Sequence, residues 1–343
     1  MLKKYLPILN WSKEYNRSLF ISDFVAAIIV TIMLIPQSLA YALLAGLPAE
    51  VGLYASILPL MAYTIFGSSR FLSVGPVAVV SLMTAAAVGN FALQNTAEYL
   101  AIAVALAWIS GGILIVMGLL RLGIMANFLS HPVISGFITA SGLIIAASQL
   151  KHILGIESSG HNLFDIVLNL LAHRDQAHGP TVLLGISTLL FLLWVRRYFK
   201  PLLLTLGLSN FMADIVAKAG PVLAVVVTIF ITWFYDLELL GVRIVGEVPT
   251  GLPSLQLPQF DSELWQQLFI SALLISIVGF VESVSVAQTL AAKRRQRISP
   301  DQELIGLGAS NIASAISGGF PVTGGFSRSV VNFDAGAATP AAG

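Results

Sequence analysis

Two charged residues lie inside long apolar segments of this sequence. Glu282 is in the middle of the segment 266–291, and Arg328 is in the last apolar segment, which starts near residue 320. A charge at the centre of a bilayer costs about 2.5–3.5 kcal/mol on insertion scales, so both are candidates for function and for being each other's partner. The alternative is a buried ion pair that only pins two helices together.

Polar neighbours of these charges fall at helical spacing. Glu282, Ser285 and Thr289 are at i, i+3 and i+7, which puts three oxygen-bearing side chains on one helix face. Gln37 and Tyr41, in the first apolar segment, are at i and i+4 and also share a face. For these two, the alternative is an interhelical hydrogen bond with ordinary packing.

A shift of 245 residues (321 − 76 and 282 − 37) relates two parts of the chain. It places Pro76 on Pro321 and Gln37-Ser38 on Glu282-Ser283. Paired apolar segments broken by Gly and Pro, in corresponding positions of two halves, point to the binding site of a transporter. Proline fits the first turn of a helix, where its missing N–H is harmless. The sequence therefore predicts two half-helices that start at Pro76 and Pro321.

Two such helix starts, facing each other near the bilayer midplane, would form an anion site without a metal. Each start has unpaired N–H groups and about +0.5 charge. Arg328 adds planar donors suited to an oxyanion, and Gln37, Tyr41 and Ser327 can add neutral donors. The pattern therefore favours a small oxyanion over a cation or a neutral solute.

Glu282 could couple this site to an ion gradient. An arriving anion would compete for Arg328 and so favour protonated Glu282, which is a route to proton–anion symport. Sodium held by the oxygens of Glu282, Ser285 and Thr289 is the alternative, and the sequence does not decide between them.

Composition places these residues in a polytopic membrane protein. The 343 residues are 57% hydrophobic and 10% charged, whereas soluble domains carry about 25% charged residues. The net charge of +1 gives no basic face for nucleic acid, and the absence of cysteine excludes disulfides and thiolate sites. We find no nucleophile–base set and no metal-ligand cluster, and expect neither an enzyme nor a cofactor.

The apolar segments predict ten membrane spans. They lie near 22–45, 50–67, 75–92, 97–120, 128–150, 180–197, 220–236, 266–291, 302–317 and from 320 on. With residues 1–20 as a cytoplasmic N-terminus, most of the 18 Lys and Arg residues fall on the cytoplasmic side, as the positive-inside rule requires. We expect 152–179 to be a solvated periplasmic loop and the proline-containing segment 237–265 to be a connector.

Several motifs, in order along the chain, resemble the SulP (sulfate permease) family. The runs are Ile35-Pro36-Gln37-Ser38-Leu39-Ala40-Tyr41-Ala42, Val51-Gly52-Leu53-Tyr54, Phe66-Gly67-Ser68-Ser69-Arg70, Val74-Gly75-Pro76-Val77-Ala78-Val79-Val80-Ser81-Leu82, Gly246-Glu247-Val248-Pro249-Thr250-Gly251-Leu252-Pro253 and Pro321-Val322-Thr323-Gly324-Gly325-Phe326-Ser327-Arg328-Ser329. The likeness covers nearly the whole chain, and the ordered set of motifs makes it specific.

The resemblance implies an all-α polytopic fold of fourteen spans in two inverted repeats of seven, divided into a core and a gate domain. In this 7+7 fold, spans 3 and 10 are half-helices. The chain would hold the first repeat (21–236), the connector (237–265) and spans 8–10 of the second repeat (266–343). Four spans and a C-terminal STAS domain would then be missing.

The resemblance also implies which residues form the site. Gln37 and Tyr41 from the first span, Val77 and Ala78 from the third, and Phe326, Ser327 and Arg328 from the tenth would line the anion site. Glu282, with Ser285 near it, would serve ion coupling. Some bacterial members have a carboxylate where this chain has Gln37, so their coupling need not transfer.

The resulting expectation is secondary transport of sulfate across a bacterial inner membrane, coupled to protons, by a protein that could form a homodimer. One alternative is a bicarbonate or dicarboxylate transporter with sodium coupling. Another is an inactive or regulatory truncated membrane protein that pairs with a full-length subunit. A nucleobase transporter is a further alternative, and Arg328 argues against it, because an uncharged base needs no buried cation.

Overall fold

The computed structural model describes residues 5–94, 96–127, 131–156, 163–218, 220–244 and 251–343, except 254, 256, 259 and 260. The chain divides into two compact units, Met1–Ile134 with Val248–Gly343 (unit 1) and Ser135–Glu247 (unit 2). Residues 246–250 of the predicted family motif and much of the predicted connector 237–265 lie outside the described residues.

Unit 1 is helical apart from two short strands. Its elements are α2 (Ile8–Trp11), η1 (Ser12–Glu14), α3 (Arg17–Leu44), α4 (Ala49–Tyr54), α5 (Leu58–Phe66), β1 (Val74–Gly75), α6 (Ala78–Val88), α7 (Ala97–Leu119), η2 (Leu122–Asn127), α14 (Ser262–Lys293), α15 (Pro300–Ile316), β2 (Thr323–Gly324), α16 (Phe326–Asp334) and η5 (Pro340–Ala342).

The described residues of unit 2 form helices joined by turns and loops, without a strand. It contains most of α8 (His131–Leu154), then α9 (Leu163–Ala172), η3 (Arg174–Gln176), α10 (Gly179–Trp194), the π-helical turn η4 (Val195–Phe199), α11 (Lys200–Thr205), α12 (Asn210–Lys218) and α13 (Gly220–Phe234).

Five helical stretches in the described part of the chain are long and apolar enough to cross a membrane. They are Arg17–Leu44, Ala49–Phe66, Ala97–Leu119, Gly179–Thr205 and Ser262–Lys293. In contrast, α6 and α16 have 11 and 9 residues. At 1.5 Å per residue they are about 17 and 14 Å long, roughly half of the 30 Å hydrocarbon core.

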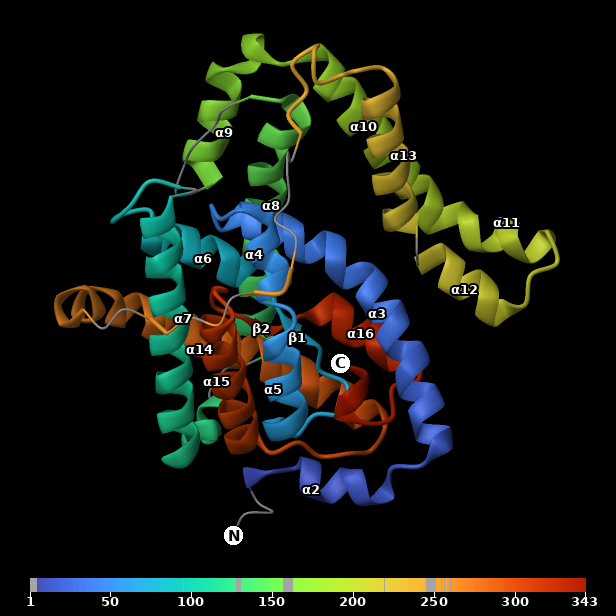
Figure 1. Ribbon diagram of the computed structural model, residues 1–343. Coiled ribbons are helices and arrows are strands. Elements are labelled where there is room, and N and C mark those ends of the chain that lie inside the picture. The colour runs from blue at the N-terminus through green and yellow to red at the C-terminus, as the bar shows by residue number, and fades with distance from the viewer. Residues whose placement is uncertain are drawn as a thin grey trace. The chain divides into compact units, whose positions relative to one another are not determined.

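The centre of unit 1 is a helix pair packed at backbone distance. In Figure 1, α7 lies beside α15, with α14 next to both. A Cβ added at Gly111 of α7 would lie 2.8 Å from the Gly308 oxygen, and one added at Gly308 would lie 2.8 Å from the Gly111 oxygen. Any larger residue at either position would push the two helices apart, so the pair sets the frame around the strands.

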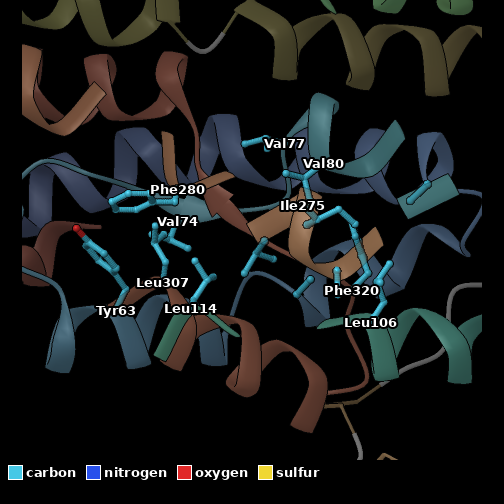
Figure 2. Close-up of a cluster of buried hydrophobic side chains, with 14 of the residues drawn as sticks. Tyr63, Val74, Val77, Val80, Leu106, Leu114, Ile275, Phe280, Leu307 and Phe320 are labelled. Atoms are coloured by element: carbon cyan, nitrogen blue, oxygen red, sulfur yellow. The ribbon is translucent and has the colours of Figure 1, made fainter. Parts of the chain in front are cut away.

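Apolar side chains surround the strands. Val74 of β1 and the following Val77 are buried in one cluster with Phe280 of α14, Leu307 of α15 and Phe320 (Figure 2). Because these side chains come from segments more than 200 residues apart, burying them fixes the strands against α14 and α15.

The structure refines one expected span and corrects one expected loop. The span expected at 50–67 coincides with the apolar stretch Ala49–Phe66, which is broken at 55–57 into two helices, α4 and α5, with a proline in the first turn of α5. The expected periplasmic loop 152–179 contains the helix α9, with Ile166 and Leu170 buried. Four histidines made this segment look polar, whereas the period of its leucines and isoleucines is helical.

Candidate anion site

Two extended segments from distant parts of unit 1 meet in its interior. β1 and β2 pair antiparallel, with Val74 opposite Gly324 and Gly75 opposite Thr323. Each strand leads within three residues into a short helix, β1 into α6 and β2 into α16. Since the strands run in opposite directions, the two helices leave the same place in opposite directions.

Helix α14 holds this strand pair by hydroxyl groups. Ser283 Oγ lies 2.6 Å from Thr323 Oγ1 and accepts a hydrogen bond of 2.8 Å from the Gly324 N–H. Thr323 Oγ1 donates to the Gly279 carbonyl at 2.7 Å. Gly279 has no room for a side chain, because a Cβ there would lie 3.1 Å from Thr323 Oγ1. The strand pair is therefore fixed one helical turn from Glu282.

The predicted half-helix starts are displaced. α6 begins at Ala78, two residues after Pro76, and α16 begins at Phe326, five residues after Pro321. The prediction that these prolines open the helices is therefore wrong, and the shift between the two helix starts is 248 residues (326 − 78). Val322-Thr323-Gly324-Gly325 is extended because Thr323 and Gly324 bond to β1 and α14 before the chain can turn.

Neither of these helices has a side chain that caps its start. The cap residues are Val77 for α6 and Gly325 for α16, which have no hydrogen-bonding side chain. The helices α3, α7 and α14 are capped by Asn16, Thr96 and Asp261, whereas α5, α10 and α15 also have no side-chain cap. The first N–H groups of a helix have no partner inside it. Two uncapped helix starts beside the buried strand pair therefore leave N–H donors that a ligand could bind.

Arg328 lies in the first turn of α16, and its guanidinium rests against the strands. The residue is 1% exposed, and Nη1 donates to the Pro76 carbonyl at 2.8 Å. A Cβ on Gly325 would lie 3.0 Å from Nη2, and one on Gly75 would lie 3.2 Å from it, so both glycines make room for the side chain. Nε and Nη2 are buried without a hydrogen-bond partner. A buried cation with unused donors is the expected form of an unfilled oxyanion site.

Glu282 is near Arg328 but does not bond to it. No oxygen of Glu282 lies within 4.0 Å of a guanidinium nitrogen, and Oε2 is buried without a hydrogen-bond partner. The two residues and Tyr41 are within electrostatic range of one another. The alternative of an ion pair that pins two helices is therefore not what the structure contains.

The other predicted residues lie on the elements that meet at this place. Gln37 and Tyr41 are half-buried on α3, which packs against α6 and α16. Ala78 is the first residue of α6, and Phe326 and Ser327 are exposed at the start of α16. Ser285 is half-buried one turn beyond Glu282, and its carbonyl accepts a hydrogen bond from Thr289 Oγ1 at 2.7 Å. Thr289 is exposed at the next turn.

Sequence reasoning missed one polar group beside the start of α6. Ser81 lies in the first turns of α6, is 0% exposed, and its Oγ has no hydrogen-bond partner. The signal was present, since Ser81 is part of the motif that begins at Val74. A serine in an apolar helix usually bonds to a carbonyl one turn back, as Thr84 does to Val80 at 2.8 Å, and Ser81 does not.

A second buried carboxylate was also missed, and it is fully bonded. Glu303, in the first turn of α15, is 0% exposed and accepts from Tyr63 Oη at 2.6 Å, Ser68 N at 2.8 Å, Ser68 Oγ at 2.6 Å and Ser69 N at 2.9 Å. Ser69 Oγ in turn accepts from the N–H groups of Phe71 and Leu72, both at 3.3 Å. Glu303 therefore fixes the segment that leads into β1.

Comparison with known proteins agrees with this geometry. The pattern of the sulfate permease family matches residues 20–343. The chain belongs to this family. It is 38% identical over 340 residues to the chloroplastic sulfate transporter 4.1 of Arabidopsis thaliana, covering 98% of this chain and 48% of the relative. It is 32% identical over 362 residues to the sodium-independent sulfate anion transporter of Bos taurus, covering 100% of this chain and 58% of the relative.

Solved structures show the same fold. The murine solute carrier 26 member A9 anion transporter in an inward-facing state matches with a TM-score of 0.86 and 25% identity, over 99% of this chain and 57% of that chain. The transmembrane domain of the cyanobacterial bicarbonate transporter BicA matches with a TM-score of 0.79 and 23% identity, over 96% of this chain and 80% of that domain chain. The latter likeness concerns the fold alone.

Membership confirms the prediction of an all-α, multi-pass membrane protein of the sulfate permease family. It also confirms that the protein belongs to a transporter family and is not an enzyme. The chain spans about half the length of the curated relatives it matches, with 48% and 58% of the two named above.

Proposed function

We propose that this protein binds a small oxyanion, with sulfate as the first candidate, at the strand pair between α6 and α16, and transports it across a membrane. The observation that carries the proposal is the combination of two uncapped helix starts with the buried, incompletely bonded guanidinium of Arg328. Backbone N–H donors and guanidinium N–H donors together favour an anion with several acceptor oxygens. The names of the Arabidopsis and bovine relatives support sulfate.

The anion ligands follow from this arrangement. The backbone N–H groups at the start of α6, after Val77 and Ala78, and those at the start of α16, at Phe326 and Ser327, would bind the oxygens. Arg328 would supply the full positive charge. Gln37 and Tyr41 of α3 would add neutral donors and close the site from a third helix.

The repeat structure is a further part of the proposal. The short helices α6 and α16 follow antiparallel strands, as inverted repeats require, and Ser38 and Ser283 both use their hydroxyls to bond to a neighbouring segment. We place the first repeat at 21–236 and spans 8–10 of the second at 266–343. The N-terminus would be cytoplasmic and the membrane a bacterial inner membrane, and a homodimer stays a prediction.

We further propose proton coupling through Glu282. Its buried Oε2 has no partner, so a proton could be held there without breaking an existing hydrogen bond. Sodium coupling is the second candidate, because Ser285 and Thr289 place further oxygens on the helix of Glu282. The bovine relative is named as sodium-independent, which favours the proton.

Binding of radiolabelled sulfate to the purified protein tests the site. Arg328→Ala should weaken binding at least about a hundredfold, because hydrogen bonds to charged groups contribute about 1.5–3 kcal/mol each. Arg174→Ala is the matched control, since Arg174 is exposed and paired only with Asp175 at 3.7 Å. Equal sulfate affinity in wild type and Arg328→Ala would refute the site.

Uptake into proteoliposomes tests the coupling. With a proton gradient directed inward, sulfate uptake should accelerate, and Glu282→Gln should remove that acceleration while leaving sulfate binding within a few-fold of wild type. An inward sodium gradient should have no effect. Acceleration by sodium and not by protons would reverse the assignment and favour the sodium candidate.

A further inference from the structure

We propose that the turn after α14 is a collecting site for anions on their way to Arg328. This basic turn comprises Lys293, Arg294, Arg295 and Arg297, four cations in five residues. The inference rests on the proposed function, because it concerns the same oxyanion and the same site. Its ligand is a small inorganic dianion in solution, held loosely by charge and not enclosed.

The basic turn is exposed, and carboxylates do not neutralise it. All four side chains are exposed, and in the described part of the chain no Asp or Glu oxygen lies within 4.0 Å of their charged nitrogens. Four unpaired cations in one turn create a positive potential that raises the local concentration of anions.

Two of these cations are held against the helix that carries the anion site. Lys293 Nζ lies 5.8 Å and Arg294 Cζ lies 5.1 Å from the ring centre of Phe333 in α16. The Phe333 ring also packs edge-on against the ring of Phe71, with 5.0 Å between the two ring centroids. Cation–π contacts with Phe333 therefore hold the charged ends of Lys293 and Arg294 in place, whereas cations on a solvated tail would be free to move.

The distance to the site is short enough for the two fields to add. Phe333 follows Arg328 by five residues in α16, which is about 7.5 Å along the helix. The Debye length is about 10 Å at 0.1 M ionic strength. An anion near the ring of Phe333 is therefore close to the basic turn and within about one Debye length of the start of α16.

The backbone of the basic turn has a strained conformation at Arg295. Arg295 has φ of 53°, in the left-handed region where glycine is usual, and the Gln296 N–H bonds to the Ala291 carbonyl at 2.8 Å to end the helix. An arginine in this conformation is strained relative to a residue with negative φ. Glycine would form the same turn without that strain but would lack the charge.

Basic residues after a span also set membrane orientation, which is the alternative explanation. That role acts during insertion and predicts no effect on the affinity of the folded protein. Binding of radiolabelled sulfate to purified protein in nanodiscs of neutral phosphatidylcholine separates the two roles. The test variant is Lys293→Gln with Arg294→Gln, and the control is Arg196→Gln with Arg197→Gln, an adjacent pair in unit 2 of which Arg197 also contacts a ring.

At about 0.01 M choline gluconate, where the Debye length is about 30 Å, the test variant should bind sulfate about three- to tenfold more weakly than wild type. At about 1 M salt, where the Debye length is about 3 Å, the test variant and wild type should bind sulfate with equal affinity. The control variant should have the sulfate affinity of wild type at both salt concentrations. Equal affinities at low salt, an equal loss in the control, or a loss seen only when anionic lipid is added would overturn the inference. If wild type itself binds no sulfate, the proposed function fails first.

Discussion

Two of the buried charged clusters of unit 1 differ in how completely their hydrogen bonds are formed. The Glu303 carboxylate accepts four hydrogen bonds from Tyr63, Ser68 and Ser69. Arg328 makes one side-chain bond, to Pro76, while its Nε and Nη2, like Glu282 Oε2 nearby, have none. A buried polar group without a partner is costly. The saturated cluster therefore has the form of a structural element, whereas the unsaturated one has the free donors and acceptor that the proposed anion site needs.

The largest effect on stability should come from the saturated cluster. Glu303→Ala leaves the N–H groups of Ser68 and Ser69 and the hydroxyl of Tyr63 buried without an acceptor, so we expect a loss of about 3 kcal/mol in the free energy of unfolding. Thermal unfolding in detergent measures it. Sulfate affinity of the remaining folded protein should stay within about threefold. A variant that is stable but no longer binds sulfate would break the distinction between the clusters.

The opposite result is expected at the unsaturated cluster. Arg328→Met replaces a buried charge that is incompletely hydrogen-bonded with an apolar side chain of similar volume. The free energy of unfolding should therefore be unchanged or rise by about 1 kcal/mol. Sulfate binding should be lost, because the guanidinium is gone. The same unfolding and binding measurements apply. A large loss of stability would show that Arg328 is as structural as Glu303.

Crowding the guanidinium should have a smaller effect. Gly325→Ala places a Cβ 3.0 Å from Nη2 of Arg328 and 3.2 Å from its Cζ, and the side chain must shift by a few tenths of an ångström. Because this shift moves the donors of Arg328 out of place, we expect sulfate affinity to fall about tenfold, which corresponds to about 1.4 kcal/mol of binding free energy. Gly112→Ala is the control, because nothing lies within 4 Å of its added Cβ. Equal affinities in both variants would place the anion elsewhere.

The smallest effect is expected at Ser81. Its buried hydroxyl has no partner, so Ser81→Ala should cost no stability and should weaken sulfate binding by about three- to tenfold if the hydroxyl donates to the anion. Thr84→Val, one turn further along α6, removes a hydroxyl that is already bonded to Val80 and should leave binding unchanged. Binding isotherms for both variants would decide whether Ser81 belongs to the site.

The sequence could predict the long helices and single out Glu282 and Arg328, because apolar length and a charge inside an apolar segment are local signals. It could not place the starts of α6 and α16. Proline suggested a first turn at residue 321, but the bonds from Ser283 and from β1 to the segment 322–325 keep that segment extended. Those bonds join residues far apart in the chain, so no local pattern contains them.

The role of Glu303 was hidden for a related reason. An acidic residue in the first turn of a helix, after Asp301, is ordinarily solvated and favourable to the helix dipole. Only the fold shows that Tyr63 and Ser68, more than 230 positions earlier, surround it.

The pairing of β1 with β2 has a consequence for biosynthesis. Val74 is made 250 residues before Gly324, its partner in the strand pair (324 − 74). At about 5–20 residues per second, the first strand waits roughly 12–50 s for the second. During that time its backbone N–H and C=O groups have no strand to bond to in an environment that offers little water. The strand pair is thus among the last features of the nascent chain to form.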